Sequence, residues 1–365
     1  MKYGANIMAN MADILKYQVK MNASDVHLCA GRKPYLRIHG ELMDTEFPVL
    51  GPDDVKRLIY SVLTEQQIKT LEEDNELDLS YIMPDLCRFR LNVYRQRGSY
   101  AVSVRAIPFQ VEPFDDLGIP LAVKDFANNM HGLVLVTGPQ GSGKTTTLAA
   151  ILDHINSTSK SHVITIEDPI EYVHRSKRSI INQREIAKDT ASYKTAMKYL
   201  LRQDVDVCLI GEIRDQDTVE TALALAEAGV LVLSTLHSPS AAESISRIVD
   251  MFPPEYQAPL KNQLSLALKA VVAQQLIPRK DEKGRVLACE IMTVTHSIHN
   301  MIKHFSIKQI YSMIQTGRAE GMQTMDQALL QLYSNGKISR YELKRRAFDV
   351  QQVMDEVRKI ELHVT

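Results

Sequence analysis

Apolar positions in the first hundred or so residues follow two periodicities. In 11–20 (MADILKYQVK) and 53–73 they recur at helical spacing, and the aspartates at the start of 53–73 are typical of a first helical turn. In 33–42 (KPYLRIHGEL) apolar and polar residues alternate, as they do in a half-buried strand. The stretch 87–107 alternates on both sides of Gly98, which predicts two strands joined by a turn. The pattern indicates an α+β module with a sheet.

The second part of the chain has a different pattern, with short apolar runs that are nearly continuous. Such runs are typical of strands buried on both faces of a parallel sheet. Segments with helical spacing, among them 144–156 and 215–229, lie between the runs, so we expect an α/β core with helices on both faces. The last hundred residues are expected to be mainly helical. The four runs are GLVLVTG (132–138), SHVITIED (161–168), DVCLIGE (206–212) and GVLVLSTLH (229–237).

The change of pattern predicts where the chain divides. Between the two parts lies PFQVEPFDDLGIP, a proline-containing stretch with little periodicity, which we interpret as a linker. The predicted organisation is an N-terminal domain at 1–108, a linker at 109–120 and a second domain with a helical C-terminal segment at 121–365. A length of 365 residues is ample for two such domains.

Composition excludes several classes of protein. With 45% hydrophobic and 24% charged residues the chain is expected to be globular, and a formal net charge of −1 argues against a general affinity for nucleic acid or anionic lipid. The four cysteines are scattered, which favours reduced thiols over a zinc site or disulfides. No apolar run approaches the roughly 20 residues that cross a bilayer. We therefore expect a cytoplasmic protein whose contact with a membrane is peripheral.

The stretch GPQGSGKTTT carries the clearest chemistry, because it fits the pattern G-x-x-x-x-G-K-[ST] between a predicted strand and a predicted helix. Glycines let several backbone N–H groups face one anion, and the N-terminus of the helix adds positive potential. Lys144 is expected to contact the β- and γ-phosphates of ATP, and the Thr145 hydroxyl to bind Mg²⁺. The predicted ATP-binding residues are Gly138, Pro139, Gln140, Gly141, Ser142, Gly143, Lys144, Thr145 and Thr146.

Hydrolysis requires acidic groups beside this loop, and two strand ends supply them. Glu212 ends the run DVCLIGE and is the candidate for polarising the attacking water and for holding Mg²⁺ through ATP. Glu167, Asp168 and Glu171 form a second acidic cluster, which indicates a water-positioning or magnesium-linked role or, for the last two, capping of the next segment. His237 follows the next run and is a candidate for sensing the γ-phosphate. The predicted catalytic residues are Glu212, Glu167 and His237.

Arginine is the usual partner of a phosphate in the transition state, and a neighbouring subunit can supply it. Several arginines lie on the predicted strands of the first module, although surface arginines are more often simply solvated. Spacing does not distinguish among the candidates, which are Arg88, Arg90, Arg97 and Arg105.

These motifs together resemble the secretion-superfamily hexameric ATPases, and among them the type IV pilus retraction motors. The resemblance covers nearly the whole chain. It rests on ASDVHL (23–28), the phosphate loop, ITIEDPIEY (164–172), NQREIAKDT (182–190), DVDVCLIGEIRDQDT (204–218), LVLSTLHS (231–238) and MIQTG (313–317).

The resemblance implies a PAS-like N-terminal domain, a RecA-like P-loop core and a homo-hexameric ring that binds ATP with Mg²⁺. It implies that the ring docks at the inner-membrane base of the pilus, acts on a platform protein there and disassembles the pilus, which produces twitching motility. It also implies that Glu167, Asp168 and Glu171 are the family's Asp box, that Glu212 is its Walker B glutamate, and that residues 229–237 are its His box.

The sequence departs from the family pattern at Val230, Ala187, His299 and His304, where the family usually has His, Gly, Arg and Glu. These departures keep open an accessory paralogue with weak turnover. A pilus-assembly or type II secretion ATPase is a second alternative, although such chains are longer and usually carry a four-cysteine zinc insertion. An ATPase that moves DNA is disfavoured, because following a phosphate backbone calls for a basic channel.

Lys144→Ala is expected to abolish ATP binding or hydrolysis, because it removes the positive charge from the β- and γ-phosphates. Binding of a fluorescent ATP analogue and phosphate release by the purified protein check this, with Lys160→Ala outside the motif as the control. Unchanged turnover in Lys144→Ala would refute the assignment of the phosphate loop.

Overall fold

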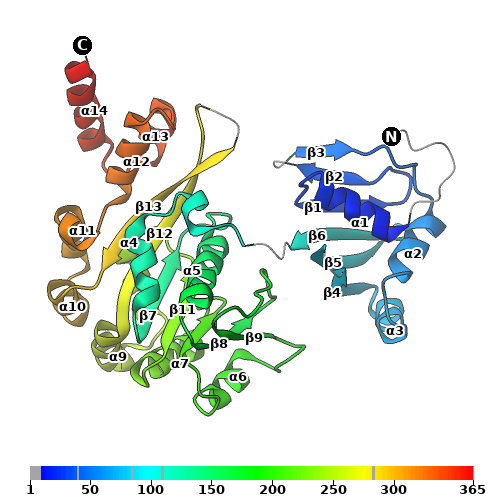
Figure 1. Ribbon diagram of the computed structural model, residues 1–365, viewed down its shortest axis with the longest axis horizontal. Helices are drawn as coiled ribbons and strands as arrows, with labels where there is room; N and C mark the ends of the chain where they lie inside the picture. Colours follow the sequence, from blue (N-terminus) through cyan, green and yellow to red (C-terminus); the bar gives the residue numbers. More distant parts are fainter. Residues whose placement is uncertain (1–9, 39–40, 84–85, 108–110, 282–283, 365) are drawn as a thin grey trace. The chain divides into compact units, whose positions relative to one another are not determined.

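The computed structural model describes residues 10–38, 41–83, 86–107, 111–281 and 284–364. The chain divides into two compact units, Met1–Gln110 and Val111–Thr365, each built around its own sheet (Figure 1). Within the described ranges, every helix is too short or too polar to span a lipid bilayer.

The first unit is an antiparallel sheet of six strands with helices, as its mixed periodicity predicted. The strands are ordered β3-β2-β1-β6-β5-β4, and β5 and β6 turn tightly at Arg97 and Gly98, which have φ angles of +46° and +79°. The predicted turn at Gly98 is confirmed. The elements are α1 (Met11–Lys20), β1 (Asp25–Cys29), β2 (Tyr35–Ile38), β3 (Glu41–Asp44), α2 (Pro52–Tyr60), α3 (Glu65–Asp74), β4 (Glu76–Met83), β5 (Cys87–Gln96) and β6 (Ser99–Ile107).

The single helix expected over 53–73 is instead two helices, α2 and α3. Thr64 separates them as the N-cap of α3. The backbone N–H of Gln67 donates to the Thr64 hydroxyl at 3.3 Å, and the backbone N–H of Thr64 donates to the Gln67 side-chain oxygen at 2.9 Å. This reciprocal pair satisfies two backbone N–H donors at the start of a new helix. The helical spacing of apolar residues therefore continues through Thr64, although the helix itself is interrupted there.

The second unit contains a seven-stranded sheet ordered β13-β12-β7-β11-β10-β8-β9, parallel except for the edge strand β13. Its elements are α4 (Leu121–Asp125), β7 (Gly132–Thr137), α5 (Lys144–Thr158), β8 (His162–Glu167), β9 (Ile180–Glu185), α6 (Tyr193–Leu200), β10 (Val207–Ile210), α7 (Gln216–Glu227), β11 (Leu231–Leu236), α8 (Ala241–Asp250), α9 (Pro254–Ala267), β12 (Leu268–Pro278), β13 (Arg285–Thr293), α10 (His296–Lys303), α11 (Ile307–Thr316), α12 (Met325–Ser334), α13 (Arg340–Arg346) and α14 (Val350–Val364).

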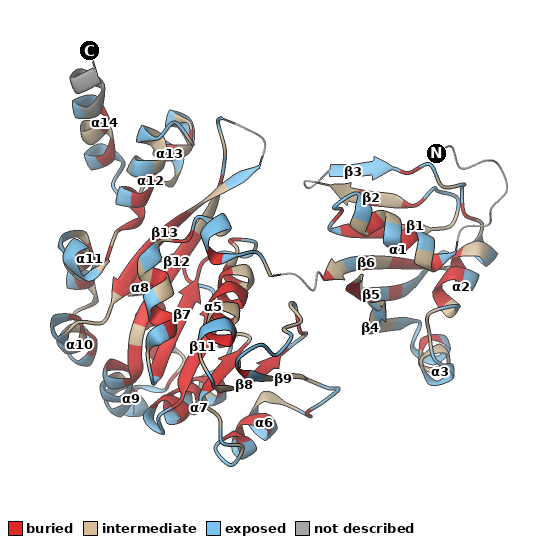
Figure 2. Cartoon of the chain, in the orientation of Figure 1, coloured by how far each residue is buried: buried red, intermediate tan, exposed pale blue. Residues whose placement is uncertain are grey.

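Both faces of this sheet are buried, which explains why its strands read as continuous apolar runs. Along β7, Leu133 and Leu135 pack into one hydrophobic cluster and Val134 and Val136 into the other. Helices α6 to α11 contribute to the first cluster, and α4 and α5 to the second. Figure 2 shows the buried residues concentrated along these strands and on the inner sides of the helices. The predicted α/β core with helices on both faces is confirmed.

The strand pair β12 and β13 was not predicted, because the last hundred residues were expected to be mainly helical. Strand β12 lies beside β7 as the second strand from the edge of the sheet, and β13 pairs with it at the edge, so the first part of this stretch forms strands that were not expected. Polar residues interrupt the apolar pattern of β12, among them Gln274, which is fully buried. The helical C-terminal part is present and begins with α10.

The predicted linker at 109–120 begins outside the described residues, at 109 and 110. Its described part is not an open tether, because Phe114–Leu117 form a 3₁₀ turn. Phe114 and Ile119 are buried in the hydrophobic cluster on the α5 side of the second sheet. This stretch therefore folds as part of the second unit.

Removing the Thr64 hydroxyl should loosen the start of α3. Thr64→Ala is expected to destabilise this helix by about 1 kcal/mol, which corresponds to roughly fivefold faster hydrogen exchange over 65–74. Mass-spectrometric exchange on the whole chain measures it. Thr70→Ala is the matched control, since the Thr70 hydroxyl only donates to the Gln66 carbonyl within the same helix. Equal exchange rates in the two variants would contradict the capping role.

Candidate active site

The phosphate loop connects the end of β7 to the start of α5 and depends on glycine. Gly138, Gly141 and Gly143 have φ angles of +142°, +75° and +89°, which side chains rarely tolerate. A Cβ on Gly138 would lie 2.5 Å from the backbone oxygen of Gln274 and 2.6 Å from the Ser142 hydroxyl oxygen. The loop therefore fits against β12 only with glycine at this position.

The other predicted ATP-binding residues lie in this loop or in the first turn of α5, which contains Lys144, Thr145 and Thr146. The hydroxyl of Ser142 is buried and has no hydrogen-bond partner among the described residues. A buried hydroxyl without a partner is unfavourable unless a ligand or water completes it. The orphaned hydroxyl and the Cβ-free cradle both fit a bound polyphosphate.

Lys144 is held at the loop by the loop itself. Its ammonium donates to the backbone oxygens of Gly138 at 2.9 Å and Pro139 at 3.0 Å, and the residue is only 8% exposed. Burial lowers the pKa of Lys144, and the negative charge of Glu171 opposes that shift. The cation is thus fixed where a phosphate chain would lie along the loop.

Strand order brings the predicted catalytic residues to one edge of the sheet. Because β7, β11, β10 and β8 are adjacent and parallel, their carboxyl ends meet there. The phosphate loop follows β7, His237 follows β11, Glu212 follows β10, and Glu167 ends β8. An edge of this kind is where open α/β sheets bind ligands.

Glu212 lies in a small network of charged side chains. Its carboxylate pairs with Arg214 and lies 3.4 Å from Nε2 of His237. Arg214 also reaches a carboxylate oxygen of Asp168 at 3.5 Å. Asp168 thus contacts the charged network around Glu212. The third member of the acidic cluster, Glu171, instead opposes the lowering of the pKa of Lys144 by burial through its negative charge.

The surroundings of His237 favour its neutral form. Partial burial lowers its pKa below 6.5, and the positive charges of Lys144, Arg247 and Arg214 lower it further. Arg247 also donates to the backbone oxygen of His237 at 2.6 Å, which fixes the turn after β11. A neutral imidazole can both donate and accept a hydrogen bond, as a sensor of a phosphate oxygen would need to.

Glu167 is the most enclosed of the predicted catalytic acids, at 7% exposure. Its Oε1 accepts from the Thr165 hydroxyl at 2.6 Å and from the Gln183 amide at 3.2 Å. Burial raises the pKa of Glu167, and these hydrogen bonds to the ionised form oppose the shift. A carboxyl with a raised pKa in such a place is suited to take up a proton.

The four candidate arginines lie in the first unit, three of them in contact with side chains of that unit. Arg97 occupies the turn between β5 and β6 and is exposed. Whether any of the four reaches a nucleotide in another subunit stays a prediction. The three contacts are Arg88 donating to the Ser80 hydroxyl at 2.9 Å, Arg90 donating to Asp78 at 3.1 Å and Arg105 donating to Asp25 at 2.9 Å.

Sequence reasoning missed four side chains around this site: Gln183, Tyr172, Gln274 and Arg247. The Tyr172 hydroxyl shares a hydrogen bond of 2.9 Å with Thr146, and the Gln274 amide donates to the Thr147 hydroxyl at 2.7 Å. Gln183 and Tyr172 stand inside stretches that carried the family resemblance, which is the one signal that pointed to them.

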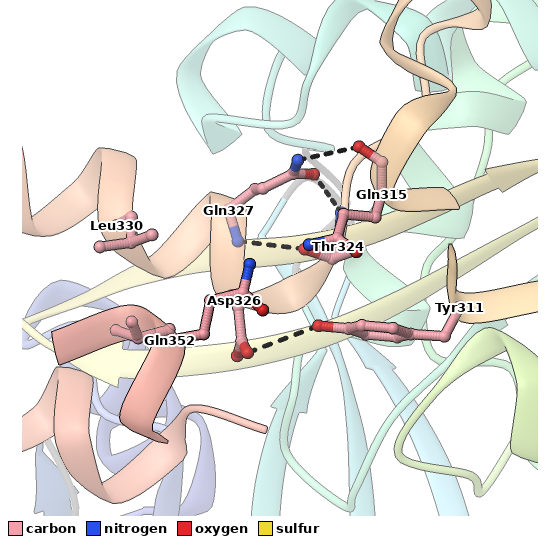
Figure 3. A pocket seen from close by; sticks show the side chains of 8 residues that line it. Tyr311, Gln315, Thr324, Asp326, Gln327, Leu330 and Gln352 are labelled. Atoms are coloured by element: carbon pink, nitrogen blue, oxygen red, sulfur yellow. Dashed lines mark hydrogen bonds between the residues drawn. The ribbon is translucent and has the colours of Figure 1, made fainter. Parts of the chain in front are cut away.

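A small cavity lies elsewhere, among the C-terminal helices (Figure 3). At about 30 Å³ it has room for roughly one water molecule and not for a nucleotide. Its central carboxylate, Asp326, accepts from the backbone N–H groups of Phe348 and Asp349 at 2.7 and 2.8 Å and from the Tyr311 hydroxyl at 3.5 Å. This cluster joins α11, α12 and the start of α14, and we assign it a structural role.

Comparison with known proteins agrees with this arrangement. The family described as Type II/IV secretion system protein matches residues 4–362. The type IV pilus retraction ATPase PilT of Pseudomonas aeruginosa is 44% identical over 338 residues, 93% of this chain and 98% of that protein. The type IV pilus ATPase PilU of the same organism is 36% identical over 326 residues, 89% of this chain and 85% of that protein.

A solved structure of the pilus retraction motor PilT with bound ADP has the same fold. It aligns with a TM-score of 0.88 at 42% identity and covers 94% of this chain and 98% of that one. An ATPase of known structure from Legionella pneumophila, DotB, shares the fold at 23% identity, with a TM-score of 0.81 over 94% of this chain and 97% of that one.

Gly138→Ala is expected to weaken nucleotide binding by about tenfold or more, because the added methyl group collides with the Gln274 backbone and must distort the loop. Titration with a fluorescent ADP analogue measures the affinity. Gly141→Ala is the matched control: it also requires a positive φ, but its Cβ would meet no atom within 4 Å. Equal affinities in the two variants would show that the contact with β12 does not shape the loop.

Proposed function

The chain belongs to the type II/IV secretion system protein family and is a nucleotide-binding ATPase, and on that premise we propose that it drives the retraction of type IV pili. The observation that carries the proposal is the 44% identity to PilT over 98% of the length of that protein. Such coverage includes both units and every motif of the site. The phosphate loop, the acidic strand ends and the neutral His237 described above are the parts that ATP hydrolysis requires.

Each predicted residue then has a definite task. Lys144 and the backbone N–H groups of the phosphate loop hold the phosphates, while the Thr145 hydroxyl and Glu212 would hold Mg²⁺ together with ATP. Bound Mg²⁺ would neutralise charge that develops on the transferred phosphoryl group. Glu212 orients the attacking water and Glu167 accepts its proton. His237, neutral beside Lys144, donates to the γ-phosphate and so distinguishes ATP from ADP.

We propose that the working form is a homo-hexameric ring docked at the inner-membrane base of the pilus, where it acts on the platform protein. Its support is the membership of the family and the resemblance to the hexameric secretion motors. Arginines of the first unit, among them the exposed Arg97 in its turn, are the groups that would reach a neighbouring subunit.

A second candidate is an accessory ATPase of the same pilus with weak turnover of its own. The observation in its favour is Val230, which stands where the family usually has a histidine. Val230 is 4% exposed and packs in the hydrophobic cluster of the sheet. This position therefore contributes no polar side chain to the site. The greater identity to PilT than to PilU favours the retraction motor.

Deletion of the gene separates the candidates. For a retraction motor, the deleted strain is expected to carry excess surface pili and to lose twitching motility, and Glu212→Ala is expected not to restore it. Loss of pili on deletion would indicate an assembly ATPase instead. The purified wild-type ring should hydrolyse ATP about 100-fold faster than Glu212→Ala, since that variant lacks the group that orients the water. Equal rates would leave only the accessory role.

A further inference from the structure

Gln183, on β9, joins three segments around the acidic strand end. Its amide nitrogen donates to Oε1 of Glu167 at 3.2 Å and to the backbone oxygen of Tyr172 at 2.7 Å. Its amide oxygen accepts from the backbone N–H of His174 at 2.8 Å. One side chain therefore fixes a carboxylate and two points of the loop that follows it.

These contacts leave the two oxygens of Glu167 unequal. Oε1 accepts from both Gln183 and the Thr165 hydroxyl. Among the residues that the structure describes, Oε2 accepts only from the backbone N–H of Glu171, at 3.4 Å, and it keeps acceptor capacity. Since the carboxylate cannot rotate without breaking the two bonds at Oε1, the direction in which Oε2 faces is fixed.

The hydrogen bonds of Gln183 to Glu167, Tyr172 and His174 form a clamp, and this clamp extends to the phosphate loop through Tyr172. The Tyr172 hydroxyl shares a hydrogen bond of 2.9 Å with Thr146, in the first turn of α5 and two residues after Lys144. Gln183 holds the backbone of Tyr172, so it links the position of Glu167 to the helix whose N-terminus faces the phosphates.

We propose that Gln183 is a positioning residue that aims Oε2 of Glu167 at the attacking water and, through Tyr172, keeps this acid in register with the phosphate loop. The inference rests on the proposed role of Glu167 in ATP hydrolysis and adds the group that orients it. Its chemistry requires an amide, because Gln183 must donate to two oxygens and accept from one N–H at the same time.

Two variants of the full-length chain test the proposal against a purely structural role. Gln183→Met keeps the length of the side chain and removes all three hydrogen bonds. Gln183→Glu keeps an acceptor for the His174 N–H but sets an oxygen against Oε1 of Glu167 and the Tyr172 carbonyl. If Gln183 only braced the loop through His174, the glutamate would preserve activity. If Gln183 acts as the donor to Glu167, the glutamate is as damaging as methionine or worse.

Steady-state ATP hydrolysis provides the readout. We expect kcat to fall about 10- to 100-fold in both variants with KM for ATP changed less than about threefold, because binding through the loop persists while the acid is misplaced. Asn182→Met is the matched control. Asn182 is the preceding residue of β9, and its amide hydrogen-bonds His162 at 2.8 Å, outside the clamp. Its kcat should stay within about twofold of wild type.

Tyr172→Phe tests the link to the phosphate loop. This variant removes one hydroxyl. The fold-loss of kcat in the double variant Tyr172→Phe/Gln183→Met should be smaller than the product of the fold-losses of the two single variants, because both substitutions break the same chain of contacts. Multiplicative effects would overturn the coupling through Tyr172, and a wild-type kcat in Gln183→Met would overturn the positioning role. Equal losses in kcat and in affinity for a fluorescent ADP analogue would identify a structural residue.

Lys144→Ala keeps this test distinct from that of the proposed function. If Lys144→Ala is inactive while Gln183→Met is fully active, the ATPase site stands and only the inference about Gln183 fails. If Lys144→Ala retains wild-type turnover, the proposed function itself fails.

Discussion

The parallel pairing of β7, β11, β10 and β8 is the constraint on which the whole site depends. Parallel strands place their carboxyl ends at one edge of the sheet, so the residues that follow the strands lie close together there. No attraction between the polar side chains is needed to bring them together. Burial of both sheet faces sets the register, because a shift of one residue would exchange the two hydrophobic clusters. The chemistry at the edge is therefore positioned by apolar packing beneath it.

At that edge the fold holds polar groups in conditions that cost free energy. Lys144 and Glu167 are almost fully buried, and the desolvation of each opposes its charge. Both are retained because the backbone and neighbouring side chains supply compensating contacts, which are carbonyls for the lysine and donors for the glutamate. Groups held this way need little rearrangement when charge develops nearby, which is the condition for electrostatic stabilisation of a transition state.

Local patterns predicted the parts of this molecule that local physics determines. The phosphate loop, the apolar strands and the turn at Gly98 follow from glycine conformation and burial, and each could be read directly. The break at Thr64 could not be predicted from the spacing of apolar residues, because that spacing continues through it. The capping residues Thr64 and Gln67 are nevertheless present in the sequence at the spacing that a capping box requires. Strand β12 was missed because its buried Gln274 interrupts the pattern, and that residue makes sense only beside Thr147. Gln183 has the same character: its three partners are brought to it by the fold.

The place of β12 in the sheet has a consequence for how the protein is made. Strand β7 begins at Gly132, but the neighbour that shapes its loop, β12, begins only at Leu268. During synthesis from the N-terminus, the first unit is complete long before the second. The nucleotide cradle therefore cannot close on the ribosome until β12 has emerged, and a nascent chain stopped before Leu268 exposes the bare flank of a central strand.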